Sequence, residues 1–107
     1  MRIPGAVLLV ASLGVALPAV TCAADPAALA SSAGCAKCHA PNAKLLGPAY
    51  HAIAAKYAKD AAAPARLAQA VRTGSKGTWG PVPMPATDAK KIGDADLNAV
   101  IGWILRQ

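Results

Sequence analysis

Five consecutive residues, Cys35 to His39, read C-A-K-C-H and constrain this 107-residue chain more than any other feature. A C-x-x-C-H run is the attachment motif of a c-type haem. Two thiols separated by two residues can reach both vinyl groups of one porphyrin from a single helical turn. The histidine that follows directs its imidazole at the iron. A fold that carries this motif must therefore leave room for a flat, mostly apolar group beside it.

The same pair of cysteines has three other readings. In an oxidising compartment it could form a disulfide, and its spacing also suits a redox dithiol or half of a zinc site. A zinc site needs two further ligands, but beyond residue 24 there is one other histidine, His51, and no other cysteine. A thioredoxin-like site needs alternating strand and helix patterns, and the sequence has none. The motif therefore favours haem attachment, with one haem c for the chain.

The composition indicates a thin protein core. From residue 25 to residue 107, 22 of the 83 residues are alanine, and phenylalanine is absent from the whole chain. Only 18 larger apolar side chains remain in that region once its two cysteines are set aside. Because alanine buries little area, such a core is too small for a stable domain of this length without a further staple. We expect the haem to supply the missing centre.

Residues 1–24 have the pattern of a secretory signal peptide. Arg2 provides a positive charge, residues 3–17 are mostly apolar, and small residues precede Asp25. This pattern predicts cleavage after Ala23 or Ala24, which leaves a mature monohaem domain at 25–107.

Two alternatives concern the same segment. Residues 3–20 are just long enough to span a bilayer as an anchor, but prolines and glycines interrupt them and no positively charged stop follows. A lipid anchor on Cys22 is a weaker alternative. We therefore expect export to a bacterial periplasm, with no stable membrane insertion after cleavage.

The spacing of apolar residues predicts an all-α fold of four to five short helices wrapped around one haem. We find no strand alternation and no internal repeat. The segment 74–85 contains three glycines and three prolines, which argues against any regular element there. The expected helices cover 27–33, 49–57, 64–72 and 94–106.

A second iron ligand is predicted at Met84, the only methionine after Met1. It lies in the run W-G-P-V-P-M-P, where prolines on both sides impose an extended, stiff backbone. Most methionines fill gaps in a core, but a gap-filler needs no rigid flanks, whereas a weak thioether bond to iron benefits from them. The rival ligand is His51, twelve residues beyond His39. We expect His51 on the proximal side or on the surface.

Taken in order, the haem motif at 35–39, G-P-A-Y at 47–50, G-S at 74–75 and W-G-P-V-P-M-P at 79–85 resemble the small bacterial class I cytochromes c of the c-551 type. The resemblance covers essentially the whole mature chain. It implies a soluble periplasmic one-electron carrier rather than an enzyme. Such a carrier shuttles electrons between respiratory membrane complexes and a terminal reductase or oxidase, such as a nitrite reductase.

The resemblance also implies individual roles. The histidine of the motif and the methionine would be axial ligands, and the two cysteines would form thioethers. A proline carbonyl would accept the second imidazole N–H, and a tryptophan indole would donate to a haem propionate. The implied cofactor-binding set is Cys35, Cys38, His39, Pro48, Trp79 and Met84.

Some positions depart from the family pattern. Ala70 stands where a basic residue often helps to bind a propionate, so that Arg66, Arg72 or no residue takes that part. Thr87 stands where an asparagine can hydrogen-bond the methionine sulfur. These departures bear on the redox potential rather than on the function.

The positive charge of the chain bears on its partners. The formal net charge is +6, and loss of Arg2 with the leader lowers it to +5. We expect a monomer that meets redox proteins through their acidic docking surfaces. Nucleic acid is not expected, because no recognition motif is present. Two other functions stay open: a haem-bearing electron-transfer subunit of a larger oxidoreductase, and a haem-based ligand sensor with a labile sixth position.

Overall fold

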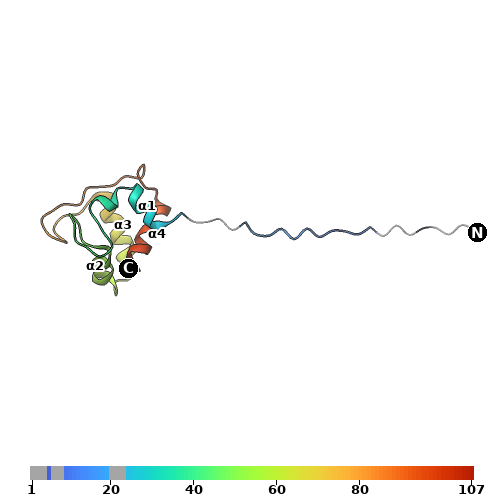
Figure 1. Ribbon diagram of the computed structural model, residues 1–107, viewed down its shortest axis with the longest axis horizontal. Coiled ribbons are helices and arrows are strands. Elements are labelled where there is room, and N and C mark those ends of the chain that lie inside the picture. Colours follow the sequence, from blue (N-terminus) through green and yellow to red (C-terminus); the bar gives the residue numbers. More distant parts are fainter. Residues whose placement is uncertain (1–4, 6–8, 20–23) are drawn as a thin grey trace, which may run out of the picture.

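The computed structural model describes residue 5, residues 9–19 and residues 24–107. Its helices are α1 (Pro26–Ser32), a 3₁₀ turn η1 (Cys35–Lys37), α2 (Tyr50–Tyr57), α3 (Ala63–Thr73) and α4 (Asp94–Leu105) (Figure 1). No strand occurs within these described ranges, which contain only two isolated bridges. The predicted all-α class is confirmed, and each expected helix agrees with the observed one to within one residue at either end.

The first helix begins and ends as local chemistry dictates. The Asp25 side chain accepts a hydrogen bond from the Ala27 amide at 3.4 Å, and Pro26 occupies the first helical position. After the helix, Gly34 has a φ of +91°, a conformation that glycine adopts without strain. The chain then turns directly into η1, so that α1 leads into the cysteine pair.

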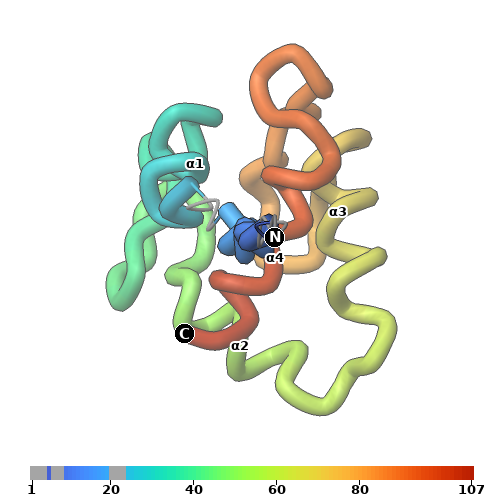
Figure 2. The backbone as a smooth tube through the Cα atoms, turned by 90° about the vertical axis from the view of Figure 1, so that its right-hand side faces the viewer, coloured from blue at the N-terminus to red at the C-terminus, as the bar shows by residue number. Residues whose placement is uncertain are grey.

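Helix α4 is the centre of the packing. It contacts α1, α2 and α3, and Figure 2 shows α1 and α3 on opposite sides of the body with α4 between them. Its Val100 and Ile101 are each only 2% exposed. Ala30 of α1 is buried against α4, and so small a side chain allows the two backbones to approach closely. The buried core cluster consists of Ala30, Ala33, Ile92, Leu97, Val100 and Ile101.

The segment 74–85 has no regular secondary structure, as predicted, but it is fixed at its two ends. Ser75 and Met84 exchange two backbone hydrogen bonds, of 3.1 and 2.8 Å. Gly74 has a φ of +80°, and a Cβ there would lie 2.8 Å from the Met84 carbonyl oxygen. The segment therefore forms a closed loop whose second end presents Met84 beside the end of α3.

Residues 9–19 form no helix or strand, and their larger apolar side chains are exposed, Leu9 at 92% and Leu13 at 90%. Within the described ranges, no helix combines the length and the apolar character needed to cross a membrane. Cys22 and Ala23 lie outside the described residues. The signal peptide and its cleavage site remain predictions.

Candidate functional site

A cavity of about 460 Å³ occupies the middle of the helical body. Its walls come from η1, α2, α3, α4 and the loop 74–85, and they are mostly apolar. Volumes of this size are typical of cofactor and ligand sites. All six residues of the set expected from the sequence line this one cavity: Cys35, Cys38, His39, Pro48, Trp79 and Met84.

The 3₁₀ turn η1 places the two thiols. Both cysteines are free and half-buried. The Cys35 carbonyl accepts hydrogen bonds from the amides of Cys38 at 3.1 Å and His39 at 2.9 Å. Both cysteines and the histidine therefore belong to one tight turn. Burial raises the pKa of the Cys35 thiol above its ordinary value. The turn thus presents both sulfurs and the imidazole to the same cavity.

The His39 ring is held by its neighbours. Its Nδ1 lies 2.7 Å from the Pro48 carbonyl oxygen. Because a carbonyl can only accept, Nδ1 carries the proton, and Nε2 keeps a lone pair free for a metal. Gly47 also lies against the ring, where a Cβ would approach the imidazole Cε1 to 2.6 Å. A side chain at position 47 would therefore displace the histidine.

Tyr50 ends the G-P-A-Y run and was given no role of its own from the sequence, but it is a neighbour of His39. Its ring stacks on the imidazole with centroids 5.6 Å apart, and meets the Trp103 ring edge-on at 5.1 Å. Tyr50 is 4% exposed, and its hydroxyl has no hydrogen-bond partner within the described chain. Burial, with the nearby Cys35 as a smaller cause, raises the pKa of Tyr50 to about 12. The cavity wall thus contains one neutral hydroxyl without a partner.

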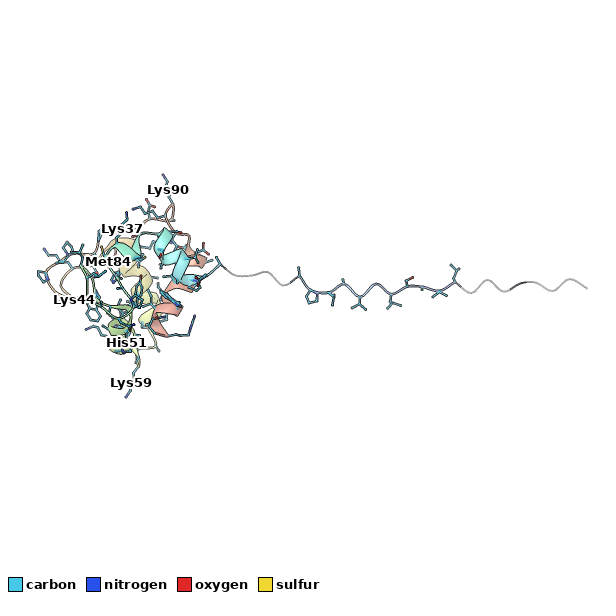
Figure 3. All side chains as sticks on the ribbon, in the orientation of Figure 1. Lys37, Lys44, His51, Lys59, Met84 and Lys90 are labelled. Atoms are coloured by element: carbon cyan, nitrogen blue, oxygen red, sulfur yellow. The ribbon has the colours of Figure 1, made fainter. Side chains whose placement is uncertain are left out.

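Met84 is half-buried in the cavity wall, while Trp79 is 38% exposed at its edge. The Lys56 ammonium lies over the Trp79 ring, 5.1 Å from the centroid. Figure 3 places His51 low on the body, apart from Met84. His51 is exposed and does not line the cavity, which confirms its expected surface position.

Neither candidate arginine lines the cavity that contains Ala70. Arg66 pairs with Asp60 at 2.8 Å, and Arg72 pairs with Asp94 at 2.7 Å. The positively charged residues that line the cavity are Lys37, Lys76 and Lys91. The sequence had not suggested any of them as a partner for a propionate.

The chemistry of this set fits a haem c. Two nearby thiols suit covalent attachment, and apolar walls suit a porphyrin. The His39 imidazole, whose Nδ1 already bonds Pro48, and the Met84 thioether would hold the iron. The unpartnered Tyr50 hydroxyl is a polar group that the protein alone leaves unsatisfied. In the described ranges, no three His, Cys, Asp or Glu side chains gather closely enough to hold a metal ion by themselves.

Comparisons with known proteins agree with this chemistry. A family profile described as "Cytochrome C oxidase, cbb3-type, subunit III" matches residues 22–104. Cytochrome c2 of Rubrivivax gelatinosus is 55% identical over 83 residues, which span 78% of this chain and 98% of that protein. Cytochrome c-551 of Pseudomonas aeruginosa is 40% identical over 104 residues, 97% of each chain.

A solved structure is similar as well. The crystal structure of Nitrosomonas europaea cytochrome c552 aligns with a TM-score of 0.69 and 42% identity, covering 75% of this chain and 96% of that one. The similarity therefore extends from the motifs to the arrangement of the helices.

Proposed function

The chain belongs to the cytochrome c family, and on that premise we propose that it carries single electrons in the periplasm through a haem ligated by His39 and Met84. Its family makes it an electron-transfer protein with one covalently bound haem c rather than an enzyme. The observation that supports the ligation best is the meeting of Cys35, Cys38, His39 and Met84 on the wall of one cavity. When bound, the haem iron supplies a one-electron couple.

The protein contributes the orientation of the ligands. The Pro48 carbonyl fixes the imidazole tautomer and makes the ring a better donor. The paired backbone bonds between Ser75 and Met84 fix the chain at the thioether. With His39 and Met84 as its ligands, the iron would be favoured in its reduced form and its potential would be raised. With both ligands held by the fold, a change of charge requires little rearrangement of the protein.

Pro48 and Trp79 complete the proposed cofactor-binding set. Trp79 lies at the exposed edge of the cavity, which suits an indole that donates to a propionate. The positive side chains that line the cavity suit the same negatively charged group. These side chains would take the part of the basic residue that the family pattern often has at position 70, where this chain has alanine.

Export and partners form part of the same proposal. The leader at 1–24 would be cleaved after Ala23 or Ala24, so N-terminal sequencing of the purified protein should start at Ala24 or Asp25. Exposed lysines surround the body, among them Lys37, Lys44 and Lys59 (Figure 3). They would steer the monomer towards acidic docking surfaces on its electron donor and acceptor.

A second candidate function has one specific observation in its favour. The matching family profile is described as an oxidase subunit, so the chain could be the haem-bearing subunit of a larger oxidoreductase. The cytochrome c2 relative, however, is covered over 98% of its own length by this chain, which favours a free carrier. Size-exclusion chromatography of native extracts separates the two, because a subunit would elute with its complex.

The ligand assignment is tested with Met84→Ala in the holoprotein. Loss of the thioether should open the iron, so the reduced variant should bind carbon monoxide readily, whereas the wild type should not. The redox potential should fall sharply, because a soft ligand that favours reduced iron is gone. Absorbance spectra of the reduced protein under carbon monoxide measure the first effect, and a redox titration measures the second.

His51→Ala is the matched control, since His51 is exposed and lies outside the cavity wall. It should leave the potential and carbon monoxide binding unchanged. An unchanged potential in Met84→Ala would refute the assignment of Met84. Ready carbon monoxide binding by the wild type would instead favour a ligand sensor.

A further inference from the structure

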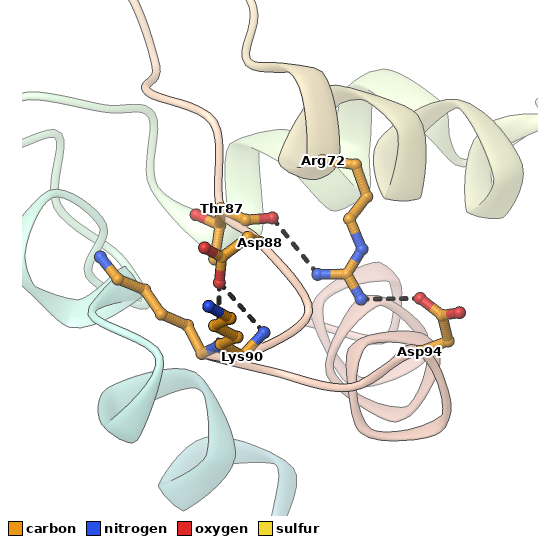
Figure 4. A network of polar contacts seen from close by, with 6 residues as sticks. Arg72, Thr87, Asp88, Lys90 and Asp94 are labelled. Carbon is orange, nitrogen blue, oxygen red and sulfur yellow. Dashed lines mark hydrogen bonds and ion pairs between the residues drawn. The ribbon is translucent and has the colours of Figure 1, made fainter.

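The segment that follows Met84 is bound to the last turn of α3. The Thr87 amide donates to the Val71 carbonyl at 2.7 Å. The Arg72 Nη1 donates to the Thr87 carbonyl at 3.3 Å, and its Nη2 donates to the Asp94 carboxylate at 2.7 Å (Figure 4). One guanidinium thus joins α3, the residues after Met84 and the first turn of α4.

The charges at this junction lie where the helices favour them. Arg72 is in the last turn of α3, and Asp94 is in the first turn of α4. Helix dipoles stabilise a cation and an anion at these respective ends. Arg72 is 22% exposed in its side chain, whereas Asp94 is 87% exposed. The shielded partner is the guanidinium that bonds the Thr87 backbone.

Met84 is therefore held from both sides. Before it, the backbone bonds to Ser75 close the loop. Three residues after it, Arg72 and Val71 hold Thr87 by its carbonyl and its amide. The residues between, Pro85 and Ala86, give the backbone little freedom, because proline fixes one dihedral angle.

We propose that Arg72 is a positioning residue for Met84: its bonds to Thr87 and Asp94 lock the Met84–Thr87 segment onto α3 and keep the thioether from leaving the iron. The inference rests on the proposed ligation by Met84. It assigns to Arg72 a part different from the propionate contact that the sequence left open. Arg72 does not line the cavity, so it acts through the backbone rather than on the haem.

The test measures how readily imidazole displaces the methionine in the ferric holoprotein. Arg72→Met removes the charge and both hydrogen bonds but keeps an unbranched side chain of similar reach. Loss of one charge-assisted backbone bond should raise the imidazole association constant about tenfold. The long-wavelength absorbance band of methionine-ligated ferric haem should weaken in parallel.

Arg66→Met is the matched control. Arg66 lies on the same helix and also forms one ion pair, with Asp60. Within the described chain, Arg66 forms no hydrogen bond or ion pair with residues 84–87. Its imidazole affinity should stay within about twofold of the wild type, since an exposed ion pair contributes little. Arg72→Lys keeps the charge without the two-pronged geometry, and should restore the wild-type affinity in part.

Asp94→Asn provides a second variant should Arg72→Met fail to fold. This substitution weakens the bond that orients the Arg72 guanidinium but leaves the guanidinium in place. It should raise the imidazole affinity by a smaller factor than Arg72→Met does. Equal imidazole affinities in the Arg72 and Arg66 variants, or in Asp94→Asn and the wild type, would overturn the proposal.

Met84→Ala distinguishes this failure from failure of the proposed function. If Met84→Ala binds imidazole no better than the wild type, Met84 is not the ligand and both proposals fall. If Met84→Ala binds imidazole much more tightly while Arg72→Met matches Arg66→Met, the ligation stands and only the role of Arg72 is refuted.

Discussion

The imidazole of His39 is enclosed by contacts of three kinds. The Pro48 carbonyl accepts a hydrogen bond from its Nδ1–H, the Gly47 backbone lies against one edge, and the Tyr50 ring stacks on its face. None of these contacts involves the cofactor. The orientation of the ring is therefore determined by the protein itself, which prepares Nε2 to bind a metal with little rearrangement.

Gly47→Ala tests this enclosure. The added Cβ would lie 2.6 Å from Cε1 and 2.9 Å from Nδ1 of His39, so the ring must shift and its bond to Pro48 must weaken. We expect a loss of about 1–3 kcal/mol in the free energy of unfolding. We also expect a higher redox potential, because an imidazole with a weaker bond to Pro48 is a poorer donor and favours the ferric iron less. Denaturant unfolding and redox titration measure the two effects.

Gly93→Ala is the control for that substitution. Its φ is −69°, and no atom lies within 4 Å of the added Cβ. The potential of this variant should equal that of the wild type. A Gly47→Ala protein with the wild-type potential would show that the ring does not depend on this contact.

At the scale of residues, the sequence was informative where chemistry follows spacing. The cysteines and histidine of one motif, and a methionine between prolines, could be singled out without a structure. The stacking of Tyr50 on His39 could not be predicted, nor could the hydrogen bonds of Arg72 to Thr87 and Asp94. The first contact joins residues 11 positions apart, and those of Arg72 join residues at least 15 positions apart. No local sequence pattern encodes contacts that only the fold creates.

Helix α4 connects the other three helices and supplies part of the cavity wall. Ile101 is 2% exposed and belongs both to the core cluster and to that wall. In a core with few large apolar side chains, each one carries a greater share of the buried area.

Ile101→Ala should therefore destabilise the holoprotein by about 2–5 kcal/mol, the range found when large buried side chains are truncated. Helical circular dichroism followed in denaturant gives the value. Asn98→Ala, an exposed position on the same helix, should change stability by no more than about 0.5 kcal/mol. Equal losses in the two variants would mean that α4 does not anchor the fold as described.

Helices were predictable because their signals are local. Such signals include the cap at Asp25, the glycines at 34 and 74 and the apolar periodicity of α4. Each expected boundary lies within one residue of the observed one. The loop 74–85 was correctly expected to be irregular. Its closure by Ser75 and Met84 was not visible in the sequence, because those backbone bonds depend on where α3 ends in space.

The whole molecule is a thin helical shell around a cavity. Its buried apolar residues include five alanines, so the shell alone buries little area. A small domain of this kind depends on a staple that contributes stability from outside the polypeptide. The composition predicted that need, and the position of the cavity at the centre of the helices agrees with it.

A Cys35→Ala/Cys38→Ala double variant tests this dependence by preventing haem attachment. We expect it to lose most of its helical circular dichroism signal and its cooperative thermal transition, because no group fills the cavity. The wild-type holoprotein, purified in the same way, is the reference. A double variant that unfolds cooperatively from a wild-type helix content would show that the shell is stable by itself.

The position of α4 as the last helix of the chain also bears on haem attachment. Synthesis runs from the N-terminus, so Cys35 and Cys38 are made well before Leu97, Val100, Ile101 and Ile104, which close one wall of the cavity. The two thiols are therefore complete while that wall does not yet exist. If the haem were attached to such an open chain, packing of the last helix would close the cavity over a group that is already bonded.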